Sequence, residues 1–400
     1  MRLVTVEDLK EGDVLANDVL LEDYTVVLSK GTVIKNAYID KLRELEIFTV
    51  YIEDAEPDKA EETKPSEKVQ APEPKKANEE KTPQKGETEA PKKKEAPKPQ
   101  RAKKPKISME KVTILRDDVE EQVRNKIKEI LELHVYQQTE GLQKIAETAQ
   151  SIITDILQED HVVEKVYDVK ERSADIYEHS LQVCTIATLI ALKLGLTEKQ
   201  VYDISVSSLI HDLGLRYLVV RYEDQDINLL PAKDQEEYKK HPIYGYTAIK
   251  NEEWLSDNAK EIVLNHHERK DGSGYPLGTD LISRMTQIVG VCDEFDELIC
   301  GVGKARVRVH EAINNIRNYS GIWFDSDIVE AFLQLIAVYP VGSRVKTNQG
   351  ELGIVMKQNP HFPERPILRI VQDRFGQAIL GEKVVDLIKE TNVVIQEVVK

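Results

Sequence analysis

Two adjacent histidines, His266 and His267, carry the clearest chemistry in the sequence. Neutral imidazole is the commonest side-chain metal ligand, and two neighbouring imidazoles can serve one ion where a helix end unwinds. The apolar, helix-prone run Ile262-Val263-Leu264 precedes the pair, and a loop with Gly272 and Gly274 follows it. These glycines allow a sharp turn or a close approach of the backbone to a ligand. Taken alone, the stretch indicates either a metal-binding helix end or a polar loop in which two histidines are adjacent by chance.

Further histidines and aspartates accompany the apolar runs on both sides of this pair. Residues four apart share a helix face, whereas consecutive residues diverge by about 100° around a helix. In a doublet, the histidine can therefore hold one ion while the aspartate bridges to a second, and a glycine two residues on predicts a helix stop. These residues are Asp175 and His179, the doublet His211-Asp212 with Gly214, His241-Pro242, and Asp293 and Asp296.

These motifs, in this order, resemble the HD-GYP family of cyclic-dinucleotide phosphodiesterases, a branch of the HD hydrolase superfamily. The doublet His211-Asp212 and the loop from Asp271 to Pro276 carry the resemblance, which covers about Glu171 to Tyr339. The resemblance implies an all-α HD-type catalytic core with two divalent ions, and some members hold a third, for which Asp175 could be a ligand. The implied ligands are His179, His211, Asp212 and Asp293 for the first ion, and Asp212, His241, His266 and His267 for the second.

The resemblance also implies a reaction. Imidazole with carboxylate suits iron, manganese, nickel or zinc better than calcium, and the family favours iron or manganese. Two ions about 3.5–4 Å apart lower the pKa of bound water and clamp both oxygens of an in-line displacement. With His211 and Asp212 activating a hydroxide that bridges the ions, we expect cyclic di-GMP to be cut to the linear dinucleotide, to GMP, or to both. The residues expected to shape the substrate pocket without binding metal are Asp271, Gly272, Tyr275 and Pro276.

Two positions that would contact substrate depart from the family pattern. The family usually reads His-Asp-x-Gly-Lys, and Leu215 stands at the lysine. After Asp296 it usually continues Ala-Leu-Thr-x-x-Arg-Pro-Tyr, and Val302 stands at the arginine. The nearest cations that could replace them are Arg216, Lys304 and Arg306. Two alternatives therefore remain open: a catalytically weak or inactive cyclic-dinucleotide receptor or scaffold, and an HD hydrolase that acts on another cyclic dinucleotide.

Charge and composition limit the partners. The formal net charge of −16 argues against nucleic-acid polymers and anionic membranes, while bound metal cations would attract a phosphate locally. No stretch approaches the ~18 uncharged apolar residues of a membrane span, and because charged residues come early at the N-terminus we expect no signal peptide. Three cysteines, all in predicted helices, indicate a reducing compartment. We therefore expect a cytoplasmic protein.

The rest of the chain predicts several domains. The small terminal domains are candidate surfaces for protein partners, and the helices before the core could pack on it or across a homodimer. Between Glu56 and Lys106, Val69 is the only Val, Ile, Leu, Met, Phe, Tyr or Trp, so this segment cannot bury enough apolar surface to fold. The expected parts are a small α+β module at 1–54, a disordered Lys/Pro/Glu-rich linker at 55–107, amphipathic helices at 108–170, the catalytic core at 171–339, and a small β-barrel-like domain at 340–400.

Overall fold

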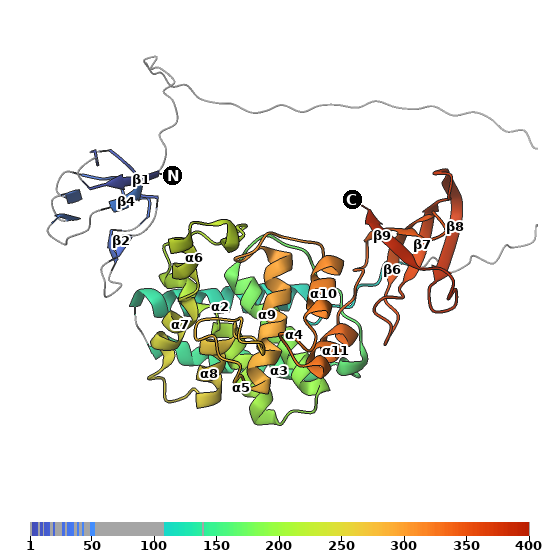
Figure 1. Cartoon of the computed structure of the whole chain (residues 1–400), viewed down its shortest axis with the longest axis horizontal. Coiled ribbons are helices and arrows are strands. Elements are labelled where there is room, and N and C mark those ends of the chain that lie inside the picture. The colour runs from blue at the N-terminus through green and yellow to red at the C-terminus, as the bar shows by residue number, and fades with distance from the viewer. Residues whose placement is uncertain are drawn as a thin grey trace, which may run out of the picture. The chain divides into compact units, whose positions relative to one another are not determined.

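The chain divides into two units, Met1–Lys106 and Ile107–Lys400, which are drawn in the computed structural model of Figure 1. The predicted linker at 55–107 lies outside the described residues. Among the described residues, no helix is long and apolar enough to cross a membrane. The structure describes residues 108–137 and 140–399, and in the N-terminal unit 2–6, 9–10, 12–16, 19–20, 26–28, 30–35, 38–39, 42–43 and 49–52.

The described residues of the N-terminal unit form two antiparallel strand pairs. Strand β1 (Arg2–Thr5) pairs with β4 (Thr49–Ile52), and β2 (Val19–Leu20) pairs with β3 (Val26–Leu28). The sequence did not predict β1, because its partner β4 lies more than 40 residues along the chain and no local pattern reveals that pairing. Buried aliphatic side chains form one hydrophobic cluster in this unit, among them Leu15, Ile34, Leu42 and Ile52.

The helical core of the second unit is built around α4 (Ile176–Lys193) and α9 (Arg284–Cys300), which pack against each other (Figure 1). Both helices are buried on nearly every face, as expected for helices at the centre of a domain. The other elements surround them: α2 (Asp117–Gln137), η1 (Glu140–Gln143), α3 (Lys144–Leu157), η2 (Val162–Glu164), α5 (Glu198–Ile210), η3 (Leu213–Tyr217), η4 (Ile227–Leu229), α6 (Ala232–Tyr238), α7 (His241–Ile249), α8 (Asp257–Asn265), α10 (Val309–Asn318) and α11 (Ser326–Leu335).

Polar side chains fix where these helices begin. Thr197 starts α5 with a capping box that includes Gln200, while Ser256 and Ser283 accept backbone N–H bonds at the starts of α8 and α9. Such caps satisfy N–H groups that have no partner inside the helix. They therefore fix the residue at which each of these helices begins.

Gly214 has a different role from the predicted helix stop. Helix α5 ends at Ile210, and Gly214 is not among the glycines with positive φ. A Cβ atom at Gly214 would lie 1.8 Å from the carbonyl oxygen of His241. Glycine is therefore needed because η3 and α7 pack with their backbones in contact, which a local pattern cannot reveal.

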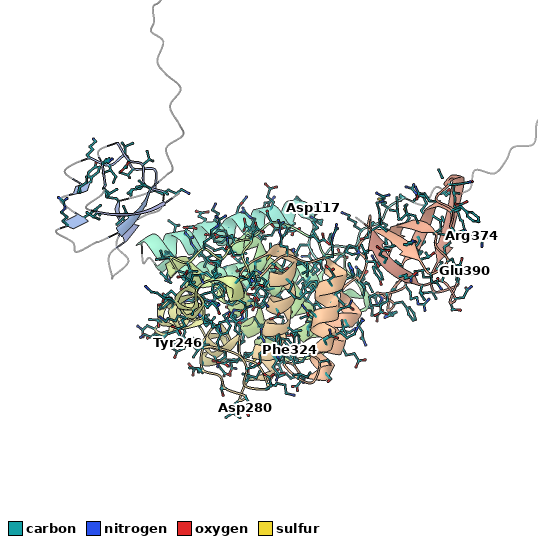
Figure 2. The ribbon with its side chains drawn as sticks, turned by 45° about the horizontal axis from the view of Figure 1, so that its top comes forward. Asp117, Tyr246, Asp280, Phe324, Arg374 and Glu390 are labelled. Carbon is teal, nitrogen blue, oxygen red and sulfur yellow. The ribbon has the colours of Figure 1, made fainter. Side chains whose placement is uncertain are left out.

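The C-terminal part of this unit is an antiparallel sheet in the order β8-β7-β6-β5-β9. The predicted turn at Asn348–Gly350 joins β5 to β6, and Gly350 adopts a φ of +81°. Strands β8 and β9 end the strand order, so the described strands form an open antiparallel sheet where a small β-barrel-like domain was predicted. Arg374 and Glu390 mark this sheet in Figure 2. Its strands are β5 (Arg344–Thr347), β6 (Leu352–Lys357), β7 (Ile367–Gln372), β8 (Ala378–Asp386) and β9 (Ile395–Val399).

Asp168 joins the helical core to this sheet. Its carboxylate accepts hydrogen bonds from Val112 N at 3.0 Å, Val341 N at 2.7 Å and Gln358 Nε2 at 2.9 Å. The three donors come from the segment before α2, the connection to the sheet, and the end of β6. One buried side chain therefore ties three separate stretches together.

Candidate metal centre

The structure brings together seven buried side chains from the sequence motifs. They form two groups that share Asp212, and the potential ligand atoms within each group lie within 4.8 Å of one another. The most exposed of the seven is Asp212, at 4%. The groups are His179, His211, Asp212 and Asp293, and Asp212, His241, His266 and His267.

In the first group, nitrogen and oxygen atoms converge at close range. His179 Nε2 lies 3.2 Å from His211 Nε2 and 3.1 Å from Asp293 Oδ1. Asp212 Oδ2 lies 3.4 Å from His179 Nε2. Helices α4 and α9 and the C-terminal end of α5 supply these atoms.

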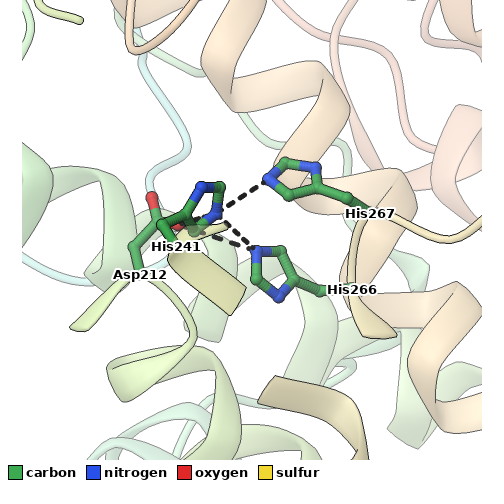
Figure 3. Close-up of side chains that lie close together, drawn as sticks. All are labelled: Asp212, His241, His266 and His267. Atoms are coloured by element: carbon green, nitrogen blue, oxygen red, sulfur yellow. Dashed lines mark hydrogen bonds and ion pairs between the residues drawn. The ribbon is translucent and has the colours of Figure 1, made fainter. Parts of the chain in front are cut away.

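In the second group, three imidazoles face Asp212 (Figure 3). His241 Nε2 lies 3.3 Å from His266 Nε2 and 3.2 Å from His267 Nε2. Asp212 Oδ1 lies 3.3 Å from His241 Nε2. The two carboxylate oxygens of Asp212 therefore serve different groups, which is the arrangement of a bridging carboxylate.

Backbone carbonyls fix the tautomers of three of the histidines. Each ring donates its Nδ1–H to the carbonyl three residues earlier, at a helix end where carbonyls have no intrahelical partner. Because a carbonyl only accepts, Nδ1 must carry the hydrogen and Nε2 keeps a bare lone pair. The bonds are His211 to Ser208 O at 2.7 Å, His241 to Tyr238 O at 2.8 Å, and His266 to Val263 O at 2.9 Å.

Bare lone pairs at such distances repel each other unless a cation lies among them. Adjacent ligands of an ion with metal–nitrogen bonds of ~2.1 Å lie about 3.0–3.4 Å apart in tetrahedral or octahedral geometry. The nitrogen–nitrogen distances, 3.2 Å in the first group and 3.2 and 3.3 Å in the second, fall in this range. The residues present therefore fit divalent metal ions.

Asp296 orients the ring of His179 through a hydrogen bond to its Nδ1 atom. Its Oδ2 accepts from His179 Nδ1 at 2.8 Å and also pairs with the buried guanidinium of Arg172. Burial lowers the pKa of His179, but the carboxylates of Asp212, Asp293 and Asp296 outweigh burial and hold that pKa well above its usual range. The surroundings of His179 thus favour positive charge, as a metal site requires.

The loop after His267 is fixed to the centre. Tyr275 stacks on the His267 ring, with centroids 4.5 Å apart. Glu268 accepts hydrogen bonds from the backbone N–H groups of residues 277–279, at 2.6–3.1 Å. A Cβ at Gly274 would lie 2.4 Å from the carbonyl oxygen of His267. Asp271 is exposed and accepts from Ser273 N at 3.0 Å, so it shapes the turn.

Four other residues named from the sequence lie in different surroundings. Asp175 is the N-cap of α4: its carboxylate accepts from Tyr177 N and Glu178 N and pairs with Arg124, which leaves it outside both ligand groups. The three candidate cations are each engaged by carboxylates: Arg216 by Glu132 at 2.8 Å, Lys304 by Glu294 and by Glu297 at 3.1 Å, and Arg306 by Asp224 at 2.9 Å.

Sequence reasoning missed Arg172 and Glu297 as neighbours of the centre. A carboxylate oxygen of Glu297 lies within 4.8 Å of ligand atoms of His267 and Asp293, and burial raises the pKa of Glu297 to about 8. The spacing Asp293, Asp296, Glu297 places all three on one helix face, so this signal was present. Arg172 had none, because its partner Asp296 is 124 residues away.

The two departures from the family pattern lie in one apolar cluster. Leu215 and Val302 are 1% and 0% exposed and belong to the same group of buried side chains as Tyr222, Ile227 and Tyr238. The ring of Tyr238 lies 5.1 Å from that of His241. Buried apolar side chains therefore occupy the two positions where the family usually has cations, in a cluster that includes a neighbour of His241.

Comparisons with known proteins agree with this geometry. The model of the HD domain family matches residues 128–328, and that of the KOW domain associated with HD domains matches residues 344–400. The chain is 28% identical over 217 residues to cyclic di-GMP phosphodiesterase PA4108 of Pseudomonas aeruginosa, covering 53% of this chain and 51% of that protein. It is 30% identical over 168 residues to a cyclic di-GMP phosphodiesterase of Thermotoga maritima, covering 41% and 45%.

The chain thus spans about half the length of these curated relatives. Among solved structures, Bd1817, an HDG"Y"P protein from Bdellovibrio bacteriovorus, aligns with 83% of this chain and 97% of its own. The alignment has a TM-score of 0.42 and 14% sequence identity.

Proposed function

The chain belongs to the HD-GYP branch of the HD domain family, and on that premise we propose that it is a metal-dependent phosphodiesterase that hydrolyses cyclic di-GMP to the linear dinucleotide, to GMP, or to both. One observation carries the proposal: two groups of buried ligands share Asp212, and each directs bare imidazole nitrogens inward. Similar proteins named as cyclic di-GMP phosphodiesterases support the substrate.

The proposed ligands are those of the two groups. When bound, a pair of divalent ions supplies Lewis acidity and lowers the pKa of water. The chain's own residues prepare for this chemistry, because backbone carbonyls hold the imidazoles in one tautomer and Asp296 holds His179. Burial of all seven side chains excludes bulk water, so their electrostatic interactions are weakly screened.

Several finer features belong to the same proposal. Imidazole with carboxylate favours iron or manganese among common ions. Two ions fit better than three, because the carboxylate of Asp175 is occupied as a helix cap. We further propose a cytoplasmic protein that forms homodimers or contacts protein partners through its terminal domains, which are a small α+β module at the N-terminus and a small KOW-like sheet domain at the C-terminus.

A cyclic-dinucleotide receptor with little or no turnover is the second candidate. The apolar cluster around Leu215 and Val302 favours it, because neither position offers a cation to a phosphate. Hydrolysis of another cyclic dinucleotide fits the same observation, since a fold does not fix a substrate.

The deciding experiment combines metal analysis with product detection. The protein is purified without oxygen, its metal content is measured, and cyclic di-GMP is followed by chromatography in the presence of iron or manganese. About two ions per chain and a linear product support the phosphodiesterase. Bound metal without product supports the receptor, which binding assays across cyclic dinucleotides would then examine.

Matched variants tie the result to this centre. His211→Ala with Asp212→Ala should abolish turnover and remove metal. His161→Ala is the control, because His161 is an exposed histidine outside both groups. Turnover retained by the double variant would exclude this centre as the active site.

A further inference from the structure

A cyclic dinucleotide carries two phosphodiester groups, and this acidic chain must attract both. One phosphodiester would lie at the metal centre. The cations that the sequence offered for the other, Arg216, Lys304 and Arg306, are each engaged by a carboxylate. Leu215 and Val302 are apolar and buried. The second phosphodiester therefore needs a cation from elsewhere in the fold.

Lys239 lies beside the centre and fits this need. It is the exposed C-cap residue of α6, two residues before His241. Its Nζ lies 5.9 Å from the centroid of the Tyr275 ring. That ring stacks on His267 at 4.5 Å and lies 6.1 Å from the His241 ring. One aromatic ring thus contacts both the ammonium group and a proposed metal ligand.

The charge of Lys239 is not neutralised by the described residues. No carboxylate in the part of the chain that the structure describes forms an ion pair with it, whereas the next residue, Lys240, pairs with Glu237 at 2.8 Å. An exposed cation–π contact is weaker than a charge-assisted hydrogen bond to a phosphate oxygen. The ammonium group can therefore leave the ring for a phosphate at little cost.

We propose that Lys239 binds the substrate phosphodiester that is not being cut. This inference rests on the proposed function and names a substrate-binding residue that the family pattern does not supply here. Because its ammonium group lies over Tyr275 and forms an ion pair with none of the proposed ligand residues, Lys239 is assigned to the phosphate away from the metal ions. It should matter only for substrates that carry two phosphodiesters.

The test compares two substrates in three variants of the full-length, metal-loaded protein. Cyclic di-GMP has two phosphodiesters, and bis(p-nitrophenyl) phosphate has one. We expect Lys239→Met to raise KM for cyclic di-GMP about tenfold, the effect of losing one charge-assisted hydrogen bond, with kcat within about twofold of the wild type. Lys239→Arg should retain most of the affinity. The matched control, Lys240→Met, should change neither constant.

Hydrolysis of bis(p-nitrophenyl) phosphate separates binding from structural damage. We expect kcat/KM for this substrate to be the same in Lys239→Met and wild type. Equal losses on both substrates would overturn the inference, because Lys239 would then support the centre itself. An unchanged KM for cyclic di-GMP would also overturn it, while leaving the proposed function in place.

If the wild-type protein does not cut cyclic di-GMP, the proposed function fails and the inference is decided by binding. Titration calorimetry of metal-loaded protein with cyclic di-GMP would then be the measurement. Weaker binding by Lys239→Met than by Lys240→Met would support the role of Lys239 in a receptor. Equal binding, or none in the wild type, would overturn it.

Discussion

His179 Nε2 lies 3.2 Å from His211 Nε2, although the two residues are 32 positions apart and come from different helices. His211 has its Nδ1 bonded to Ser208 O, and His179 has its Nδ1 bonded to Asp296. Both rings therefore direct Nε2 toward the same point. This convergence is unfavourable without positive charge, so the stability of the core should depend on a bound cation.

Removal of metal should lower thermal stability. A ligand at a hundred times its Kd stabilises the folded state by about 2.7 kcal/mol, and the seven proposed ligand residues lie in the buried core. We expect treatment with a chelator to lower the melting temperature, measured by scanning calorimetry, and added metal to restore it. Asp212→Ala, which lacks the bridging carboxylate, should respond to neither. A wild-type melting temperature that is the same with and without chelator would contradict the metal centre.

Asp296→Asn should weaken metal binding without removing a proposed ligand. The carboxylate orients His179 through its Nδ1 and neutralises the buried Arg172. Loss of such an outer partner typically costs 10–100-fold in metal affinity, and we expect a loss of about this size in competition with a chromogenic chelator. Asp327→Asn is the control, since this carboxylate pairs with the partly exposed Arg284. Equal affinities in the two variants would show that Asp296 does not tune the centre.

Leu215→Lys should destabilise the fold and should not improve substrate binding. Leu215 is 1% exposed in an apolar cluster with Val302, so a lysine there would be a buried, unpaired charge. Such a charge costs about 3–5 kcal/mol, measurable by urea denaturation. Leu215→Met keeps the volume and should cost less than ~1.5 kcal/mol. A stable lysine variant with tighter binding of cyclic di-GMP would show that position 215 faces substrate.

Glu268→Ala should loosen the loop that carries Tyr275. Three backbone N–H groups of residues 277–279 would lose their shared acceptor. Hydrogen bonds to a charged group contribute about 1.5–3 kcal/mol, so we expect faster hydrogen exchange at these amides. Glu261→Ala, on the preceding helix α8, is the control. Unchanged protection of residues 277–279 in Glu268→Ala would contradict this role.

Much of the helical core was predictable because its signals are local. Asp293 and Asp296 were expected beside an apolar run, and both lie in helix α9, which runs from Arg284 to Cys300. The three cysteines were expected in helices and are buried and free. The seven residues proposed as metal ligands from sequence are the ones that the fold brings within 4.8 Å in two groups. Three of these motifs lie at helix ends: His211 after α5, His241 at the start of α7 and His266 after α8.

The ion-pair and hydrogen-bond partners of charged side chains could not be predicted from local signals. Asp175 has the i, i+4 spacing to His179, yet its carboxylate caps α4 and contacts Arg124. Arg216 and Glu132 are 84 residues apart, and the pair leaves that arginine away from both ligand groups. Nothing in the local sequence at either residue marks its partner.

The residue types of the centre and the helices that carry them follow from local sequence, because they depend on contacts within a few residues along the chain. The need for glycine at position 214 comes instead from the packing of η3 against α7. The packing of the fold, in contrast, places Leu215 in one cluster with Val302 and Lys239 over Tyr275, where no carboxylate among the described residues pairs with the lysine. Such pairings join distant positions. They follow from how whole helices pack, which no single stretch of sequence specifies.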